Sequence, residues 1–359
     1  MAVDIYNSFY KSKRVLVTGH TGFKGSWLTI WLHELGAEVV GVALDPFTER
    51  DNYVLSGIGS KMRADMRADI RNSIALKEIF AAYQPEIVFH LAAQPLVRLS
   101  YERPVETYET NVMGTINVLE AIRETQSVKI GVMITTDKCY DNKEQVHGYK
   151  EDDPFGGYDP YSSSKGACEI AIQSWRRSYF NPGQLGSHGA SIASVRAGNV
   201  IGGGDWALDR IIPDCVKALE ANKVIEIRSP KAIRPWEHVL EPLSGYLMLA
   251  QKMWENPTGY CEGWNFGPES ESISTVWDVA LEFIKSYGHG ELKDSSDSRA
   301  VHEANLLMLD ITKAKTCLGW EPRLNMQYCI ALVADWYKRY KSEDVYNLCV
   351  EEIESYLKH

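Results

Sequence analysis

Residues 14–36 read RVLVTGHTGFKGSWLTIWLHELG: a short apolar run, three glycines spaced three apart, and a longer apolar stretch. Gly19, Gly22 and Gly25, between a Val-rich run and a helical stretch, are typical of the first strand, turn and helix of a dinucleotide-binding sheet. Glycines allow the tight turn and let backbone N–H groups approach a pyrophosphate at the helix N-terminus. This segment therefore predicts a dinucleotide site near the start of the chain.

The same glycine spacing occurs a second time, at Gly183, Gly186 and Gly189. This copy follows a proline-containing turn and precedes an apolar, strand-like run. It has neither the strand before it nor the helix after it that a phosphate-binding turn needs, so we interpret it as a loop.

Short apolar runs alternate with helical stretches through the first half of the chain. After the opening segment, the apolar runs lie at 38–45, 86–93, 130–136 and 191–198. Strands with near-continuous Val and Ile content, each followed by a helix, are typical of a parallel sheet covered on both faces. We therefore predict the α/β class, with a doubly wound parallel sheet of the Rossmann type.

The regular alternation ends near residue 200, and the later sequence contains more Gly and Pro, scattered tryptophans and three helical stretches near the C-terminus. We predict that residues 1–198 form the cofactor-binding domain, with returning segments near 234–260 and 305–312. Residues 199–359 are predicted to form mainly a second, smaller α/β lobe that binds the substrate.

Charge and composition exclude several classes of partner. The 359 residues include 38 basic and 48 acidic side chains, and no run of Lys and Arg interrupts this excess of acid, which argues against nucleic acid and membrane partners. Neither a signal peptide nor an apolar run of about 20 residues is evident, so we expect a cytoplasmic protein. Seven cysteines without a C-x-x-C pair and nine histidines without ligand spacing predict reduced thiols and no metal.

Asp45 follows the second predicted strand, about 20 residues after the glycine motif. A carboxylate there accepts from the ribose 2′-OH of NAD and repels the 2′-phosphate of NADP, so we predict NAD, although Arg50 lies close in sequence. The other predicted cofactor contacts near the glycines and at strand ends are Thr21, Phe23, Lys24, Asp69, Ile70, Leu91, Ala92, Ala93, Gln94 and Thr135.

Tyr161 and Lys165 lie four residues apart at the start of an amphipathic stretch, so they share a helix face. An ammonium beside a phenol favours the phenolate, which is able to take a proton from a sugar hydroxyl while hydride leaves for nicotinamide. The run at 130–135 precedes Tyr161 by one loop, so both are expected at the carboxyl edge of the sheet. A second such pair, Tyr337 and Lys341, lies in a charged stretch that we interpret as a surface helix without a role.

Several motifs together resemble a known family. The sequences TGHTGFKG at 18–25, HLAAQ at 90–94 and YSSSK at 161–165, with Thr136 at a strand end, resemble the extended short-chain dehydrogenase/reductase family in its nucleotide-sugar branch. Within that branch, the segments GHTGFKGSWL, TTDKCYDN, GGGDWALDRIIPD and RPWEHVLEPLSGYL are most similar to the hydro-lyases that act on CDP-glucose. The resemblance extends to about residues 318–322.

The resemblance implies a 4,6-dehydratase that converts CDP-glucose to a 4-keto-6-deoxy sugar nucleotide and water, for deoxysugar synthesis of the O-antigen or lipopolysaccharide type. It implies that Tyr161 takes the proton of the 4-OH as hydride passes to NAD. Thr136 would bond the 4-oxygen, and Lys165 would orient the cofactor ribose and lower the pKa of Tyr161. Asp137 would protonate the departing 6-OH, and the hydride would return to C6.

Lys138 occupies the position at which many relatives carry the glutamate that removes the C5 proton. A lysine must be neutral to act as a base, and a charged lysine is limited to stabilising the enolate. The neighbours act in opposite directions, because Lys165 favours the neutral form and Asp137 favours the charged form. Both roles for Lys138 therefore stay open.

The resemblance implies further contacts around the cavity. Asn111 matches a cofactor-contacting asparagine, and Arg196 and Gly198 follow the sixth strand where the family holds the nicotinamide. Residues predicted to bind the substrate, besides Thr136, are Asn199 and two arginines suited to phosphate oxygens, Arg210 and Arg234.

Two other functions share part of this pattern. A nucleotide-sugar 4-epimerase would use Tyr161, Lys165 and NAD but needs no further acid and base, so Asp137 and Lys138 favour dehydration. A non-catalytic NAD-sensing regulator would have no reason to keep Thr136 together with that pair.

The predicted helices at 104–125 and 161–180 carry apolar positions such as Val105, Val112 and Ile170. The simplest interpretation is that these positions pack on the sheet. In the family, the corresponding helices also pair across a dimer. We therefore expect a homodimer or a homotetramer.

Overall fold

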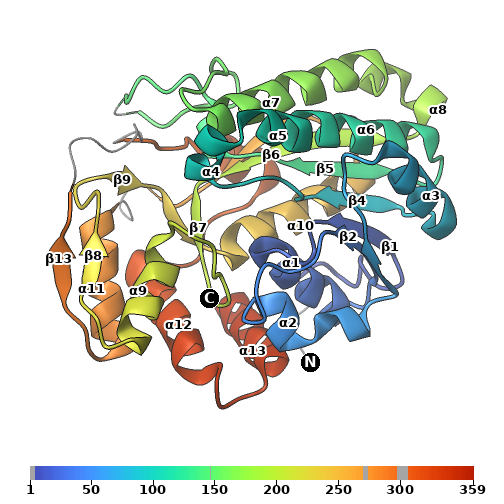
Figure 1. Ribbon diagram of the computed structural model, residues 1–359. Coiled ribbons are helices and arrows are strands. Elements are labelled where there is room, and N and C mark those ends of the chain that lie inside the picture. Colours follow the sequence, from blue (N-terminus) through green and yellow to red (C-terminus); the bar gives the residue numbers. More distant parts are fainter. Residues whose placement is uncertain (1–4, 146, 270–273, 297–305) are drawn as a thin grey trace.

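The computed structural model describes residues 5–145, 147–269, 274–296 and 306–359, and a parallel sheet of seven strands forms its centre (Figure 1). The strands are β1 Arg14–Thr18, β2 Glu38–Ala43, β3 Ala64–Arg67, β4 Ile87–His90, β5 Ile130–Ile134, β6 Ser191–Ala197 and β11 Gly263–Phe266. Their order across the sheet is β11-β6-β5-β4-β1-β2-β3, which is the doubly wound arrangement with one added edge strand. The predicted α/β fold class is confirmed.

Helices cover both faces of the sheet (Figure 1). The helices on one face are α3 Ser73–Tyr83, α6 Gly114–Glu124 and α7 Pro160–Ser178; those on the other are α1 Phe23–Glu34 and α10 Leu240–Glu255. Successive side chains of a strand point to opposite faces, so Leu16 packs in the cluster beneath the first group, and Val15 and Val17 pack in the cluster beneath the second. Burial on both sides explains why the strands read as near-continuous apolar runs.

The helix predicted over 104–125 is interrupted. It consists of α5 Pro104–Tyr108, a π-helical turn Glu109–Met113 and then α6, and it follows a short helix, α4 Val97–Glu102. The turn contains Asn111, which is buried. Such turns are frequent at functional sites, because they re-aim a side chain without breaking the helix.

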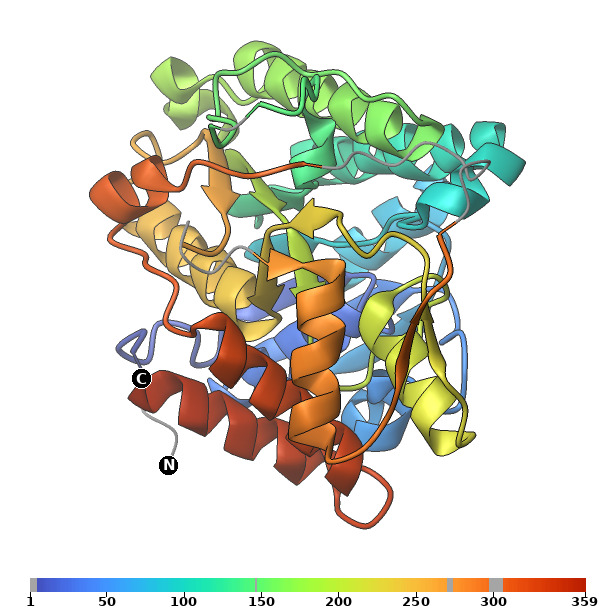
Figure 2. The same cartoon turned by 90° about the vertical axis from the view of Figure 1, so that its left-hand side faces the viewer.

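The second half of the chain forms a smaller group of elements beside the carboxyl edge of the sheet (Figures 1 and 2). Its elements are β7 Asn199–Ile201, α9 Ile211–Glu220, β8 Ile225–Ile227, β9 Ile233–Arg234, β10 Trp236–His238, β12 Ser274–Thr275, α11 Val276–Tyr287, β13 Leu292–Asp294 and α12 Met326–Arg339. The six strands in this group pair as two-stranded sheets, β7 with β10, β8 with β13 and β9 with β12. These elements place the later segments opposite the strand ends.

Parts of the later sequence also pack with the main sheet. β11 lies beyond the returning segment predicted at 234–260, and α13 Val345–Lys358 packs against α1 and α2 Asn52–Ser56. In the other returning segment, 305–312, residue 305 lies outside the described residues, and Leu309 forms a β-bridge with Tyr149. The domain boundary near residue 198 stays a prediction.

Both duplicate motifs differ from their predicted surroundings. The second glycine copy is a 3₁₀ turn at Pro182–Gln184 followed by a one-turn helix, α8 Leu185–His188, rather than a loop. Asn181 starts this turn, because its side chain accepts from Gly183 N. Tyr337 is buried inside α12 rather than at the surface, since the charged residues occupy only the helix's other face, and its hydroxyl donates to the backbone oxygen of Asp205 at 2.6 Å.

The cysteines carry free thiols. All seven cysteines are described, all are free, and only Cys317 is exposed. Among the described residues, no three His, Cys, Asp or Glu side chains lie together as a metal site. In that same part of the chain, none of the helices has the length and apolar character needed to cross a membrane.

Candidate active site

A cavity of about 1360 Å³ follows the carboxyl edge of the sheet. It runs from the glycine turn between β1 and α1 to the segments around α9 and β8. Typical sites for one small molecule are roughly 300–1,000 Å³, so this cavity has room for two ligands placed end to end. Every predicted cofactor and substrate residue lines it except Asn111 and Arg196.

The glycine turn at one end is a close-packed backbone cradle. Gly19 has φ +76°, and a Cβ there would lie 2.7 Å from Ala92 N. A Cβ on Gly25 would lie 2.0 Å from the carbonyl oxygen of Gly19. Side chains are therefore excluded where α1 begins, and the first N–H groups of that helix face the cavity as an anion site.

The side chain of Asp45 is 87% exposed at the edge of the cavity, where its Oδ1 accepts from Arg67 Nε at 3.0 Å. Arg50 lies elsewhere: its guanidinium stacks 3.5 Å from the centre of the Trp206 ring and pairs with Glu220. Arg50, which lies close to Asp45 in sequence, is therefore paired away from Asp45. The cation that pairs with Asp45 is Arg67, which the sequence did not suggest. Asp45 is placed to accept a ribose hydroxyl.

Asn111 supports the cavity from behind rather than lining it. Its Oδ1 accepts from Gln94 N at 2.8 Å, and its Nδ2 donates to Gln94 O at 3.1 Å and to Ser164 Oγ at 2.9 Å. The predicted cofactor contact is thus replaced by a contact with the loop after β4. The π-helical turn places this amide so that it fixes the loop that carries Gln94.

The segment after β5 brings the predicted acid to the cavity. Thr136 caps a 3₁₀ turn at Asp137–Cys139, and its hydroxyl donates to Asp137 Oδ1 at 2.9 Å. Asp137 is 1% exposed, and among the described residues its Oδ2 has no hydrogen-bond partner. Burial raises the pKa of Asp137, while the charges of Lys138 and Arg234 act against this. A buried carboxyl with a raised pKa suits a general acid.

Tyr161 lies in the first turn of α7, and it is 8% exposed. Burial raises the pKa of its phenol, and a hydrogen bond with Thr136 and the charge of Arg210 lower it. Lys165 was predicted to lower this pKa, but its ammonium instead donates to the backbone oxygen of Ile134 at 3.3 Å. Burial also lowers the pKa of Lys165 itself.

Arg196 does not line the cavity, in contrast to the cofactor contact that the resemblance implies. Its side chain is 2% exposed and forms an ion pair with Glu169 of α7, with Nε 2.9 Å from Oε1. A buried charge needs a partner, and alternation along β6 turns this side chain toward the helix layer.

The far end of the cavity carries several arginines. Arg210 Nη1 donates to Asp205 Oδ2 at 3.0 Å, and Arg234 Nη1 donates to the carbonyl of Ile233 at 2.9 Å. Asn199, at the start of β7, lines the same end. These groups give the cavity a positive end suited to a phosphate.

Sequence reasoning missed several charged cavity residues, among them Arg98, Asp209 and Arg228. Arg98 of α4 lies 3.5 Å from Asp209, and Arg228 also pairs with Asp209. Nothing in the spacing of these residues marks them, because Arg98 and Asp209 come from distant parts of the chain. The position of Arg98 shortly after HLAAQ is the one usable signal.

The charges of Lys24, in the first turn of α1, and of the buried Glu237 act on each other. Burial lowers the pKa of Lys24 to about 8, and the charge of Glu237 acts against this. Burial also raises the pKa of Glu237, whose Oε1 accepts from Gly198 N at 3.2 Å. Glu237 was missed by sequence reasoning, although an acid inside the apolar run RPWEHVL is a recognisable signal.

The chain is similar to known proteins along nearly its whole length. The family described as GDP-mannose 4,6 dehydratase matches residues 16–333. A CDP-glucose 4,6-dehydratase of Salmonella typhimurium is 48% identical over 354 residues, which cover 98% of each chain.

Two solved structures share the fold. A dTDP-glucose 4,6-dehydratase from Streptomyces venezuelae with NAD and TYD bound has a TM-score of 0.77 and 21% identity, covering 92% of this chain and 99% of its own. A UDP-glucose 4-epimerase from Thermus thermophilus in complex with NAD has a TM-score of 0.76 and 23% identity, covering 90% and 99%. A dehydratase and an epimerase share this fold, so the fold does not separate the two activities.

Proposed function

The chain belongs to the GDP-mannose 4,6 dehydratase family, and we propose that it is an NAD-dependent 4,6-dehydratase whose substrate is CDP-glucose. The resemblance to nucleotide-sugar enzymes is thereby confirmed at the level of the family. The substrate rests on the 48% identity with the Salmonella enzyme. The observation that carries the activity is the buried carboxyl of Asp137, whose Oδ2 has no hydrogen-bond partner in the described part of the chain and which lines the same cavity as Tyr161.

NAD fits the end of the cavity formed by the glycine turn. The turn admits no side chain at Gly19 or Gly25, so a pyrophosphate is able to reach the N-terminus of α1. Asp45 would accept a ribose hydroxyl there. Bound NAD would supply the group that accepts a hydride from the sugar and later returns it.

In the first step, Tyr161 would take the proton of the sugar 4-hydroxyl as the C4 hydride leaves. Thr136 is placed to hold the 4-oxygen, since its hydroxyl is hydrogen-bonded to the phenol. Burial raises the pKa of Tyr161 and so favours the neutral phenol, and the charge of Arg210 acts against this and favours the phenolate, which is the form that accepts a proton. The product of this step is a 4-keto sugar, whose carbonyl acidifies the C5 proton.

In the second step, the C5–H and C6–O bonds break and water leaves. The raised pKa of Asp137 favours the protonated carboxyl, which is the form able to give a proton to the departing 6-hydroxyl. Lys138, next to it at the cavity wall, would either take the C5 proton or stabilise the enolate. Return of the hydride to C6 and of a proton to C5 completes the 4-keto-6-deoxy sugar.

The nucleotide diphosphate would lie toward the arginines of the far end. Arg210 and Arg234 line the cavity there and are suited to pyrophosphate oxygens. Asn199 also lines the cavity. A cytoplasmic location and a place in deoxysugar synthesis of the O-antigen or lipopolysaccharide type stay predictions.

A competition series with CDP-, UDP- and dTDP-glucose tests the proposal. We expect CDP-glucose to give the alkali-induced absorbance of a 4-keto-6-deoxy product with the highest kcat/KM. Preference for another nucleotide would overturn the assignment of the base. Formation of a galactose isomer would indicate a 4-epimerase, and absence of turnover with every nucleotide sugar would support a cofactor-sensing regulator.

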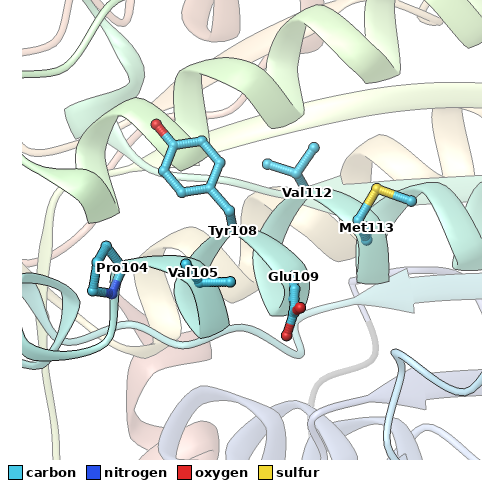
Figure 3. Close-up of a pocket in the computed structure, with 6 residues that line it drawn as sticks. All are labelled: Pro104, Val105, Tyr108, Glu109, Val112 and Met113. Atoms are coloured by element: carbon cyan, nitrogen blue, oxygen red, sulfur yellow. The ribbon is translucent and has the colours of Figure 1, made fainter.

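The outer face of α5 and the π-helical turn supports the proposed homodimer. Figure 3 shows the six residues of a pocket of about 400 Å³ on this face, which are Pro104, Val105, Tyr108, Glu109, Val112 and Met113. Val105 is 70% exposed, and Ile170 of the neighbouring α7 is 59% exposed. Apolar side chains gathered on two adjacent helices are typical of an interface between protein chains.

Sedimentation equilibrium of the Val105→Glu variant tests the dimer. We expect a dimer, or a tetramer built from dimers, for the parent chain and a shift toward monomer for the variant, because a carboxylate would be buried without a partner. Glu109→Gln at the rim of the same pocket is the control and should leave the mass unchanged. A monomeric parent chain would refute the proposal.

A further inference from the structure

The segment Thr135–Tyr140, which carries Asp137 and Lys138, is attached at both ends to one buried ion pair, Glu169–Arg196. Both charged side chains are 2% exposed, and two hydrogen bonds of 2.9 and 3.0 Å join them. Neither side chain lines the cavity, so the reaction itself does not use them. Their connections to this segment therefore need another explanation.

The first attachment is at Thr135. Its hydroxyl donates to Glu169 Oε1 at 2.5 Å, while Ser194 Oγ donates to Oε2 at 2.8 Å. Glu169 lies one helical turn beyond Lys165 and two beyond Tyr161 on α7, so the three share one face. The helix that carries the phenol and the strand end that carries Thr136 are thus joined through one carboxylate.

The second attachment is at Tyr140. Arg196 Nη1 donates to the Tyr140 hydroxyl at 2.5 Å, and this hydroxyl donates to Asn265 Oδ1 of β11 at 2.7 Å. Tyr140 is 1% exposed, and the guanidinium of Arg196 also lies 5.1 Å from the centre of its ring. The far end of the segment is thereby fixed to β6 and β11.

We propose that Tyr140 is a positioning residue: through the Glu169–Arg196 pair, it holds Asp137 and Lys138 in register with the face of α7 that carries Tyr161. This inference rests on the proposed dehydratase function. A buried ion pair adds little net stability compared with apolar packing, so fixing one arrangement is the role that its geometry suits. Asp137 and Lys138, which dehydration needs, lie between the two attachments. Thr136 directly follows the Thr135 attachment, and Tyr161 and Lys165 belong to α7, so the residues needed for oxidation do not depend on the attachment at Tyr140.

The arrangement separates the two steps of the reaction. Loss of the Tyr140 hydroxyl leaves Thr136, Tyr161 and Lys165 attached, so oxidation at C4 should proceed. Asp137 and Lys138 lose one anchor, and a shift of about 1 Å at a reacting group is able to cost roughly 10²-fold in rate. Dehydration should therefore become the slow step.

The test compares Tyr140→Phe with Tyr149→Phe, both as full chains with bound coenzyme. Tyr149 is the matched control, because its ring stacks 5.2 Å from that of Tyr140 but its hydroxyl bonds only Asn142 and Lys143 N among the described residues. For Tyr140→Phe we expect kcat to fall about 10- to 100-fold with KM for CDP-glucose close to the parent value. The transient near-ultraviolet absorbance of the coenzyme should also build up. Unchanged kcat and absorbance, or equal losses in both variants, would overturn the proposal.

Hydrogen exchange of the coenzyme-bound proteins gives a second measurement that needs no substrate. Amides of 136–141 should exchange faster in Tyr140→Phe than in the parent or in Tyr149→Phe, and equal rates in all three would overturn the positioning role. If the parent converts no nucleotide sugar, the proposed function fails, and the exchange rates still decide whether Tyr140 holds this segment.

Discussion

The two ends of the cavity are built in different ways. The cofactor end consists of backbone turns directly after β1 and β4, where a Cβ on Gly19 or Gly25 would strike main-chain atoms. The far end consists of paired side chains, such as Arg210 with Asp205 from one loop and Arg98 with Asp209 from distant parts of the chain. A change of shape at the backbone site should abolish ligand binding, whereas the loss of one side chain at the other site should reduce ligand affinity only in part.

The largest expected effect is at the cofactor end. In Gly25→Ala the added Cβ would lie 2.0 Å from Gly19 O, so the turn or α1 must move. We expect the variant to lose its bound coenzyme and about 3 kcal/mol of unfolding free energy. Coenzyme released on denaturation and urea unfolding measure the two losses.

The second glycine motif supplies the control. A Cβ on Gly186 meets no described atom within 4 Å, and this residue lies in α8. Gly186→Ala should keep the coenzyme and gain up to about 1 kcal/mol of unfolding free energy. Equal losses of coenzyme and of unfolding free energy in the two variants would show that the glycine spacing, rather than the strand and helix around it, determines these losses.

Tyr161→Phe is expected to lower kcat by about 10²–10⁴-fold, because it removes the group that takes the 4-hydroxyl proton. The coenzyme content should stay at the parent level, since the ring remains. Tyr337→Phe is the matched control from the other Y-x-x-x-K pair, and it removes the hydrogen bonds of this hydroxyl to Asp205 O and Gly202 O. It should lower stability by about 1 kcal/mol and leave kcat close to the parent value. Equal losses of kcat in both variants would exclude the assignment.

Lys138→Met should lower kcat by about 10- to 100-fold and change its pH dependence. Burial raises the pKa of Asp137, and Lys138 is the main charge that lowers it. Removing that charge raises the pKa of Asp137 further, so the acid form persists to higher pH and the alkaline limb of kcat should move upward. An unchanged rate of water elimination would remove this lysine from the chemistry.

The smallest effect is expected at the far end. Arg210→Lys keeps the charge but loses the planar pair of donors, so KM for CDP-glucose should rise about 10-fold with little change in kcat. Arg339→Lys, on the surface of α12 where the arginine pairs with Glu343, is the control and should leave KM unchanged. A fall in kcat without a change in KM would show that Arg210 acts on the phenol rather than on the substrate.

The same contrast explains what the sequence was able to predict. The parallel sheet and the residues around the glycine turn follow from local patterns, since each strand is followed by its own turn and helix. Arg196 and Asn111 were placed at the cofactor by resemblance, yet both side chains face buried partners, Glu169 and Gln94. Those partners come from other elements, so only the packed structure reveals them.

Tyr140 and Glu237 make the same point for residues that were overlooked. Glu237 is a charged side chain inside an apolar run, whereas Tyr140 follows a strand end in the polar stretch TTDKCYDN, and neither position names the partner. The Tyr140 hydroxyl meets Arg196, and Glu237 meets Gly198 N.

Conversion of CDP-glucose carrying deuterium at C4 tests the central claim most directly. If one bound coenzyme removes the C4 hydride and returns it to C6, the 4-keto-6-deoxy product should carry the deuterium at C6, without dilution when unlabelled substrate is mixed in. A product that has lost the label to solvent, or a galactose isomer that keeps it at C4, would contradict the account.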